Sequence, residues 1–182
     1  LGFIQVNAQP LFPNAAAWKW ADSTMKSMSS IQRAGQLFMV AAYSNKGLEA
    51  NEGLMRLIKN NGIGGLIFMQ GGPGRQLILT RKYQAAAKVP LLISADAEWG
   101  LAMRLDSTLA FPYAMTLGAI QDLKLIQKTA ERMAVHCRRI GITMNMAPVV
   151  DVNVNPKNPI INGRSFGENP KRVAELGVAF MK

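Results

Sequence analysis

The stretch Val89-Pro90-Leu91-Leu92-Ile93-Ser94-Ala95, followed directly by Asp96-Ala97-Glu98-Trp99-Gly100, decides the fold. A short apolar run that ends in a polar segment with glycine is typical of a strand buried on both faces, with a loop at its carboxyl end. Similar apolar runs occupy residues 37–40, 64–69 and 142–146. The pattern therefore predicts four buried parallel strands.

Helix-like segments separate these runs. Residues 48–60 place Leu54, Leu57 and Ile58 on one helical face and end at Asn61-Gly62, a pair that favours a helix end. A second helix is expected over 75–88. The clearest helix follows Asp122 as N-cap, and its apolar positions are spaced by three and four residues: Leu123, Ile126, Ala130, Met133, Cys137 and Ile140.

Strands that alternate with helices allow a doubly wound sheet or a (β/α)₈ barrel. The first strand-to-helix turn has no Gly-x-Gly-x-x-Gly, and the chain has no P-loop, which disfavours a nucleotide-binding doubly wound fold. We expect an α/β fold that is the first half of a TIM-type barrel, because a complete barrel needs about 250 residues and the chain has 182. We also expect that the missing half of the barrel, and further domains, follow Lys182.

Composition limits the function classes. With 49% hydrophobic and 18% charged residues, the chain is globular rather than disordered, and no apolar run reaches the roughly 18 residues of a membrane span. The net charge of +10 alone would suggest nucleic-acid binding, but the basic residues are scattered and no aromatic residues alternate with them. We expect no nucleic-acid partner. Cys137 is the only cysteine, so neither a disulfide nor a cysteine-based metal site is expected.

The amino-terminal residues predict export. Residues 1–8 are apolar and end in Val6-Asn7-Ala8, which resembles the tail of a secretory signal peptide cleaved after Ala8; a short buried strand is the alternative. We expect a periplasmic or extracellular protein. Residues 9–28, with Trp18 and Trp20, are interpreted as an N-terminal arm, and the domain as residues 29–182.

Acidic residues follow the third strand. Asp96 and Glu98 are two residues apart and so share one face. Paired carboxylates suit glycoside hydrolysis, but neighbours on one strand are poorly placed to flank a scissile bond. Accepting hydrogen bonds from sugar hydroxyls fits Asp96 better, and capping the next helix is the alternative. Trp99 could stack on a sugar ring or anchor the loop in the core. Arg104 could bind hydroxyls, hold a carboxylate or lie exposed.

A second long loop, over 147–169, is rich in Asn, Pro and Gly. Such a loop is expected to be held by hydrogen bonds from side chains to the backbone. Both loops follow strands, and the carboxyl ends of the strands are where ligand sites of parallel α/β folds lie.

These segments together resemble a known family. Ala147-Pro148-Val149 through Asn158-Pro159 to Arg164-Ser165-Phe166-Gly167, preceded by Asp96-x-Glu98-x-Gly100 and Phe111-Pro112, is similar to the N-terminal barrel of glycoside hydrolase family 3 over residues 29–182. The resemblance implies that Asp96, Arg104 and Arg164 bind the non-reducing-end sugar and that Glu98 and Trp99 line the site. It places the catalytic acid/base and nucleophile beyond Lys182. His136 is interpreted as structural, and no cofactor or metal is implied.

The resemblance also implies an activity. Family members of this kind are retaining, exo-acting β-glycosidases that hydrolyse O-glycosidic bonds through a covalent glycosyl-enzyme. Glu98 favours the β-N-acetylglucosaminidase branch, which acts on cell-wall or chitin-type oligosaccharides, whereas Trp99 stands where that branch usually has glycine. β-Glucosidase, β-xylosidase and a non-catalytic sugar-binding module remain as alternatives.

Overall fold

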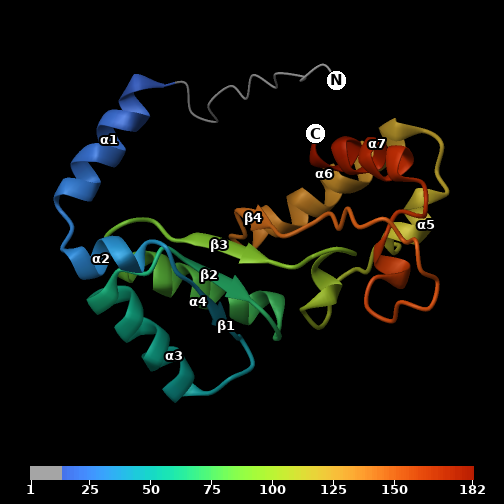
Figure 1. Cartoon of the computed structure of the whole chain (residues 1–182). Helices are drawn as coiled ribbons and strands as arrows, with labels where there is room; N and C mark the ends of the chain where they lie inside the picture. Colours follow the sequence, from blue (N-terminus) through green and yellow to red (C-terminus); the bar gives the residue numbers. More distant parts are fainter. Residues whose placement is uncertain (1–13) are drawn as a thin grey trace.

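The computed structural model describes residues 14–182 and contains one parallel sheet (Figure 1). Its strands are in the order β1-β2-β3-β4, the same as their order along the chain. Doubly wound sheets reverse the strand order at a switch point, whereas barrels add strands sequentially. The predicted α/β class with barrel-type order is therefore confirmed. The strands are β1 (Met39–Ala42), β2 (Gly65–Phe68), β3 (Leu92–Ala95) and β4 (Met144–Asn145).

Seven α-helices surround or extend from the sheet in the described part of the chain. They are α1 (Ala15–Lys26), α2 (Ser30–Gly35), α3 (Leu48–Arg56), α4 (Pro73–Ala86), α5 (Ala114–Gly118), α6 (Leu123–Arg139) and α7 (Pro170–Met181). Three short helical turns lie between them: the π-type turn η1 (Leu57–Asn61) and the 3₁₀ turns η2 (Leu101–Met103) and η3 (Asn162–Arg164).

The main core lies between the sheet and the helices α3, α4 and α6. Alternate strand residues such as Leu66, Phe68 and Ile93 point into it and are fully buried. A second cluster joins α5, α6 and α7 around Phe166, which fixes the end of the loop after β4 against these helices. The two clusters therefore hold the loop segments that leave β3 and β4.

The opposite face of the sheet has smaller and more exposed residues. Ser94 Oγ lies 2.9 Å from Met39 Sδ on this face, and Leu92 is 51% exposed. A Cβ on Gly65 would lie 2.7 Å from the carbonyl oxygen of Leu92, so a larger residue does not fit there. This face is the one that a closed barrel would turn toward its own interior.

Side chains cap the starts of α2 and α6. The Asp122 side chain accepts a hydrogen bond from Lys124 N at the start of α6, as expected, and Ser29 caps α2 in a capping box with Gln32. The helix expected over 48–60 continues from α3 into the π turn and ends at Gly62, which has a left-handed φ of 61°.

Other elements differ from the prediction. The first strand begins at Met39 rather than residue 37, because Leu37 and Phe38 are exposed in the link from α2. Within the expected arm over 9–28, residues from Ala15 form α1, a helix with no buried residue that extends away from the sheet (Figure 1). The proposed signal-peptide remnant, residues 1–8, lies outside the described residues. The remnant and the domain boundaries stay predictions.

Candidate functional site

Two long loops lie at the same end of the strands, the carboxyl end. The segments after β3 and β4 both lie on the side toward which the strand arrows point in Figure 1. Hydrogen bonds between Glu98 in the first loop and Arg164 in the second show that the loops are in contact. Ligand sites of barrel folds are built from loops at this end of the strands. The candidate residues of the sequence therefore lie at the end where a barrel places its site.

Asp96 is the first residue after β3, and its carboxylate pairs with Arg104. Arg104 Nη2 donates to Asp96 Oδ2. Both side chains are about one-fifth exposed, at 23% for Asp96 and 21% for Arg104. Within residues 14–182, no group donates a hydrogen bond to the other carboxylate oxygen, Oδ1. Asp96 is thus fixed by one oxygen and has the second available to accept a hydrogen bond from a ligand hydroxyl.

Glu98 pairs with Arg164 from the second loop. Arg164 Nη2 donates to Glu98 Oε1 at 2.7 Å, and Arg164 Nε lies 2.9 Å from Oε2 and 3.1 Å from Oε1. The Glu98 side chain is only 7% exposed, against 35% for Arg164. This two-point contact joins positions 66 residues apart and connects the loop after β3 to the loop after β4.

The charge of Arg164 is stabilised by its surroundings. Hydrogen bonding to Glu98 raises the pKa of the Arg164 guanidinium above its ordinary value; partial desolvation opposes the shift, and the negative charges of Glu98, Asp151 and Asp96 add to it. Arg164 is therefore a permanent cation among carboxylates. Its N–H groups can donate to a ligand oxygen at any ordinary pH.

Asn145 on β4 holds the backbone between the two acids. Its side chain accepts a hydrogen bond from Ala97 N at 3.0 Å and donates to Ala97 O at 3.3 Å. Ala97 lies between Asp96 and Glu98 and is itself buried. Our sequence interpretation did not single out Asn145, although a polar residue inside the apolar run 142–146 is a signal that could have identified it.

The second loop is held as its composition predicts. Asn158 Oδ1 accepts from Ile160 N at 2.9 Å, and Asn155 Oδ1 accepts from Lys157 N at 3.0 Å. The fully buried Ser165 hydroxyl accepts from Gly167 N and contacts the carbonyl oxygen of Asp151. Arg164 therefore lies on a segment whose neighbours on both sides are fixed by hydrogen bonds.

Trp99 lies beside Tyr113, another residue that the sequence did not single out. The ring centroids are 4.6 Å apart and the ring planes are inclined by 55°. The two rings, residues 159–163 and Arg164 line an open cleft of about 390 Å³. Trp99 is only partly buried, so it is not a core anchor of the loop. Stacking of Trp99 on a sugar stays a prediction.

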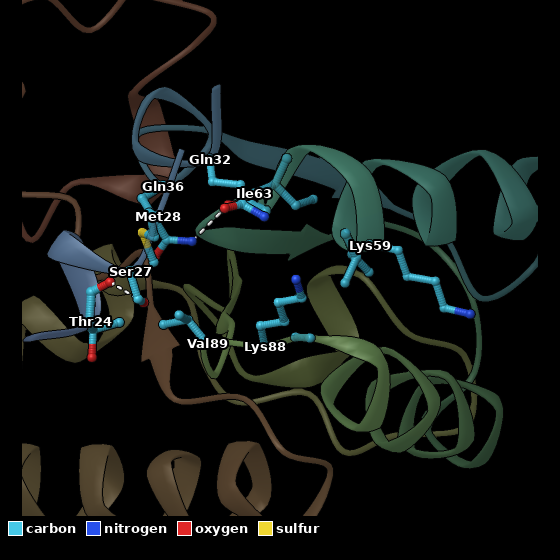
Figure 2. A pocket seen from close by; sticks show the side chains of 12 residues that line it. Thr24, Ser27, Met28, Gln32, Gln36, Lys59, Ile63, Lys88 and Val89 are labelled. Carbon is cyan, nitrogen blue, oxygen red and sulfur yellow. Dashed lines mark hydrogen bonds between the residues drawn. The ribbon is translucent and has the colours of Figure 1, made fainter. Parts of the chain in front are cut away.

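A second hollow, of about 250 Å³, lies at the other end of the strands (Figure 2). Its lining includes Gln36, which precedes β1, Ile63, which precedes β2, and Val89, which precedes β3. Gln36 Nε2 donates to Gly62 O across it at 2.7 Å. Because barrel folds place their chemistry at the carboxyl ends of the strands, this hollow is not the candidate site.

His136 lies within α6, where its ring packs 5.6 Å from that of Phe111. Within residues 14–182, no group of three or more His, Cys, Asp or Glu side chains is arranged to hold a metal ion. None of the described helices is both long enough and apolar enough to cross a bilayer.

Comparison with known sequences gives a consistent result. The model of the glycosyl hydrolase family 3 N-terminal domain matches residues 31–182. A beta-N-acetylglucosaminidase/beta-glucosidase from Cellulomonas fimi is 27% identical over 179 residues, covering 98% of this chain and 31% of the relative. Beta-hexosaminidase A from Pseudoalteromonas piscicida is 36% identical over 142 residues, covering 71% and 24%. The chain thus spans less than a third of the length of these relatives.

Solved structures extend the comparison to the fold. A glycoside hydrolase family 3 beta-N-acetylglucosaminidase from a Paenibacillus species superimposes with a TM-score of 0.72 at 34% identity, over 85% of this chain and 30% of that one. A beta-glucoside phosphorylase superimposes with a TM-score of 0.84 over 92% of this chain and 30% of that one; at 23% identity it shows a shared fold alone.

Proposed function

The chain belongs to glycosyl hydrolase family 3, as part of its N-terminal domain, and from this premise we propose that the protein containing it is a retaining, exo-acting β-N-acetylglucosaminidase. The observation behind the proposal is the group Asp96, Arg104, Glu98 and Arg164, gathered by two loops at the carboxyl end of β3. In this proposal the chain supplies residues that bind the substrate, and residues outside it perform the covalent chemistry.

The geometry suits a hydroxyl-rich ligand. A sugar hydroxyl can donate to Asp96 Oδ1 and accept from a guanidinium N–H of Arg164, and such charge-assisted hydrogen bonds are stronger than those between neutral groups. Each positive group in the cluster has a carboxylate partner, so the site offers strong donors and acceptors without a large net charge. That balance favours a neutral sugar over an anion.

The choice of sugar rests on the relatives. Proteins named beta-hexosaminidase or beta-N-acetylglucosaminidase are similar to this chain over much of its length. The name of the Cellulomonas fimi relative also includes beta-glucosidase, so β-glucosidase activity is the second candidate. A comparison of aryl glycoside substrates separates these candidates from a β-xylosidase and from a sugar-binding protein without catalytic activity.

We also propose that the protein is exported to the periplasm or the extracellular space. The proposal rests on the small-residue pattern Val6-Asn7-Ala8 after an apolar stretch. Expression from the complete reading frame, followed by sequencing of the mature amino terminus, tests it. A mature protein that begins at Gln9 outside the cytoplasm supports export, and retention of residues 1–8 in the cytoplasm contradicts it.

The hydrolase proposal is tested with the protein encoded by the complete reading frame. We expect it to cleave a para-nitrophenyl β-N-acetylglucosaminide with higher kcat/KM than the corresponding β-glucoside or β-xyloside. Replacing Arg164 by Ala should lower kcat/KM on the order of 100-fold, about 2.7 kcal/mol of transition-state binding. A higher kcat/KM for the glucoside or the xyloside would show that the assigned sugar is wrong. Binding of the glycoside without cleavage would indicate a non-catalytic protein.

Asp106→Asn provides a matched control for the Arg164 variant. Asp106 forms an exposed pair with Arg75 at 2.7 Å, so the substitution also removes one Arg–carboxylate contact, but one that involves none of the four cluster residues. We expect kcat/KM within about twofold of the wild type, because exposed pairs contribute little. If Arg164→Ala were no worse than Asp106→Asn, the proposed subsite would be wrong.

A further inference from the structure

We infer that Glu98 is a positioning residue, which holds Arg164 in place for the sugar and does not bind the sugar itself. The inference rests on the proposed function and assigns a separate role to each of the two neighbouring acids. Asp96 and Glu98 share a face of the chain, and the sequence alone offered both as site-lining residues. The structure distinguishes them by their partners and by their burial.

Both oxygens of Glu98 are occupied by one partner. Oε1 accepts from Nη2 and Nε of Arg164 at 2.7 and 3.1 Å, and Oε2 lies 2.9 Å from Nε. The side chain is 7% exposed, so little of it is accessible to a ligand. Asp96, by contrast, has an oxygen without a donor among the described residues and is 23% exposed. Of the two acids, only Asp96 has an accessible acceptor.

Arg164 depends on this contact for its orientation. It lies in the short turn η3 within a long loop. The only other hydrogen bond of its guanidinium within the described chain is from Nη1 to Ile160 O at 3.3 Å, the long end of the hydrogen-bond range. The guanidinium has five N–H donors, so donors on Nη1 and Nη2 remain after Glu98 and Ile160 are bonded. Glu98 fixes the plane of the guanidinium and thereby the direction of these donors.

The anchor for Arg164 is itself rigid. Glu98 follows Ala97, whose backbone N–H and C=O both form hydrogen bonds with the Asn145 side-chain amide on β4. Sheet, Asn145, Glu98 and Arg164 thus form one connected series from the strands to the second loop. A guanidinium held in this way loses little conformational entropy when it binds a hydroxyl. Without Glu98, that entropy would be lost at each binding event.

The test is a double-mutant cycle in the protein encoded by the complete reading frame, with Glu98→Gln, Arg164→Ala and the double variant. Glu98→Gln keeps the side-chain length but removes the charge and one acceptor oxygen. We expect it to lower kcat/KM for the aryl N-acetylglucosaminide about 10- to 100-fold in the wild-type background. In the Arg164→Ala background we expect less than about a twofold further loss, because the residue through which Glu98 acts is gone.

Thermal unfolding gives a second measurement. Arg164→Ala leaves the buried Glu98 carboxylate unpaired, so this variant should unfold at a lower temperature than the double variant, in which that charge is also removed. The Asp106→Asn control should change neither the kinetics nor the unfolding temperature appreciably, because that pair is exposed.

The possible failures are distinguishable. If Glu98→Gln lowers kcat/KM by the same factor in both backgrounds, Glu98 contacts the substrate independently and the positioning role is wrong, while the proposed function stands. An unchanged kcat/KM for Glu98→Gln also contradicts the positioning role. If the wild-type protein neither hydrolyses the glycosides nor binds N-acetylglucosamine in calorimetry, the proposed function is wrong and this inference falls with it.

Discussion

Asp96 and Glu98 show how two identical functional groups acquire different roles from their surroundings. Each carboxylate has an arginine partner, but Arg104 lies eight positions further along the same loop, whereas Arg164 comes from the next loop. The first pair orders a single loop, and the second joins two. In addition, Arg104 Nε is buried without a hydrogen-bond partner within the described chain. Among the described residues, the Arg104 guanidinium therefore hydrogen-bonds to Asp96 alone, which couples the two side chains.

Replacement of Asn145 tests whether this side chain supports the site. In Asn145→Ala, the N–H of the buried Ala97 loses its partner, whereas its C=O keeps the hydrogen bond from Gly100 N at 3.1 Å, and an unsatisfied buried N–H costs about 1–3 kcal/mol. We expect the free energy of unfolding to fall by about 2 kcal/mol or more in urea titration, and kcat/KM to fall because Asp96 and Glu98 flank Ala97. The control Asn155→Ala removes one exposed hydrogen bond and should cost less than about 1 kcal/mol. Equal losses in the two variants would mean that Asn145 does not support the site.

Part of the site could be predicted from the sequence and part could not. Polar residues directly after apolar runs must lie at the carboxyl end of a parallel sheet, so the neighbourhood of Asp96, Glu98 and Arg164 follows from the pattern. The pairing of Glu98 with Arg164 does not, because it depends on how a loop 66 residues away folds back. Tyr113 was missed for the same reason: it meets Trp99 only through tertiary packing.

At the scale of the elements, short helices depend on packing more than on sequence pattern. The helix α5 has five residues, too few to be stable alone or to show a periodicity. It forms because Ala114 and Leu117 are buried in the cluster around Phe166. The start of β1 could not be predicted from the sequence either, because Leu37 and Phe38 are apolar yet exposed. Long helices such as α6 were predictable because their apolar stripe repeats over several turns.

The contact between α5 and the end of the second loop requires Gly118. A Cβ at this position would lie 1.9 Å from the carbonyl oxygen of Phe166, which is backbone and cannot move aside cheaply. We expect Gly118→Ala to lower the free energy of unfolding by about 2 kcal/mol or more, measured by urea titration. At Gly74, near the start of α4, the space that a methyl group would take has no other atom within 4 Å. Gly74→Ala should therefore be neutral or stabilising by up to about 1 kcal/mol. A neutral Gly118→Ala would show that α5 does not pack as described.

At the scale of the whole molecule, the four strands form an open sheet. The outer strands β1 and β4 each pair with a single described strand, and one face of the sheet has exposed residues such as Leu92. A closed (β/α)₈ barrel has eight strands and turns this face inward. In such a barrel the site would form one side of the mouth, which agrees with the proposal that residues outside this chain complete the reaction centre.

Core burial also gives the molecule a pH dependence. Burial raises the pKa of the Cys137 thiol above the ordinary value of 9.0, although Arg138 partly opposes the shift. The folded state keeps the proton that the unfolded state releases, so stability from this group is complete below pH 9.0 and is lost as pH rises through the folded pKa. Burial raises the pKa of Tyr83 too, from its ordinary value of 10.0, so its contribution is complete below pH 10.0 and is lost as pH rises through its folded pKa.

Two measurements check that the Cys137 thiol is buried and that its burial contributes to the pH dependence. Native protein at pH 7 should react with a thiol reagent far more slowly than protein unfolded in urea, because Cys137 is buried in α6. The decrease in unfolding free energy above pH 9 should be shallower in Cys137→Ala than in the wild type. Native thiol reactivity equal to that of the unfolded chain would contradict the described core.

The most direct test of the sugar subsite is a crystal structure of the protein encoded by the complete reading frame with N-acetylglucosamine bound. We expect ring hydroxyls to lie about 3 Å from Asp96 Oδ1 and from an Nη atom of Arg164, while both oxygens of Glu98 remain bonded to Arg164. A sugar bound away from the carboxyl end of β3, or one that contacts Glu98 in place of Arg164, would contradict the account.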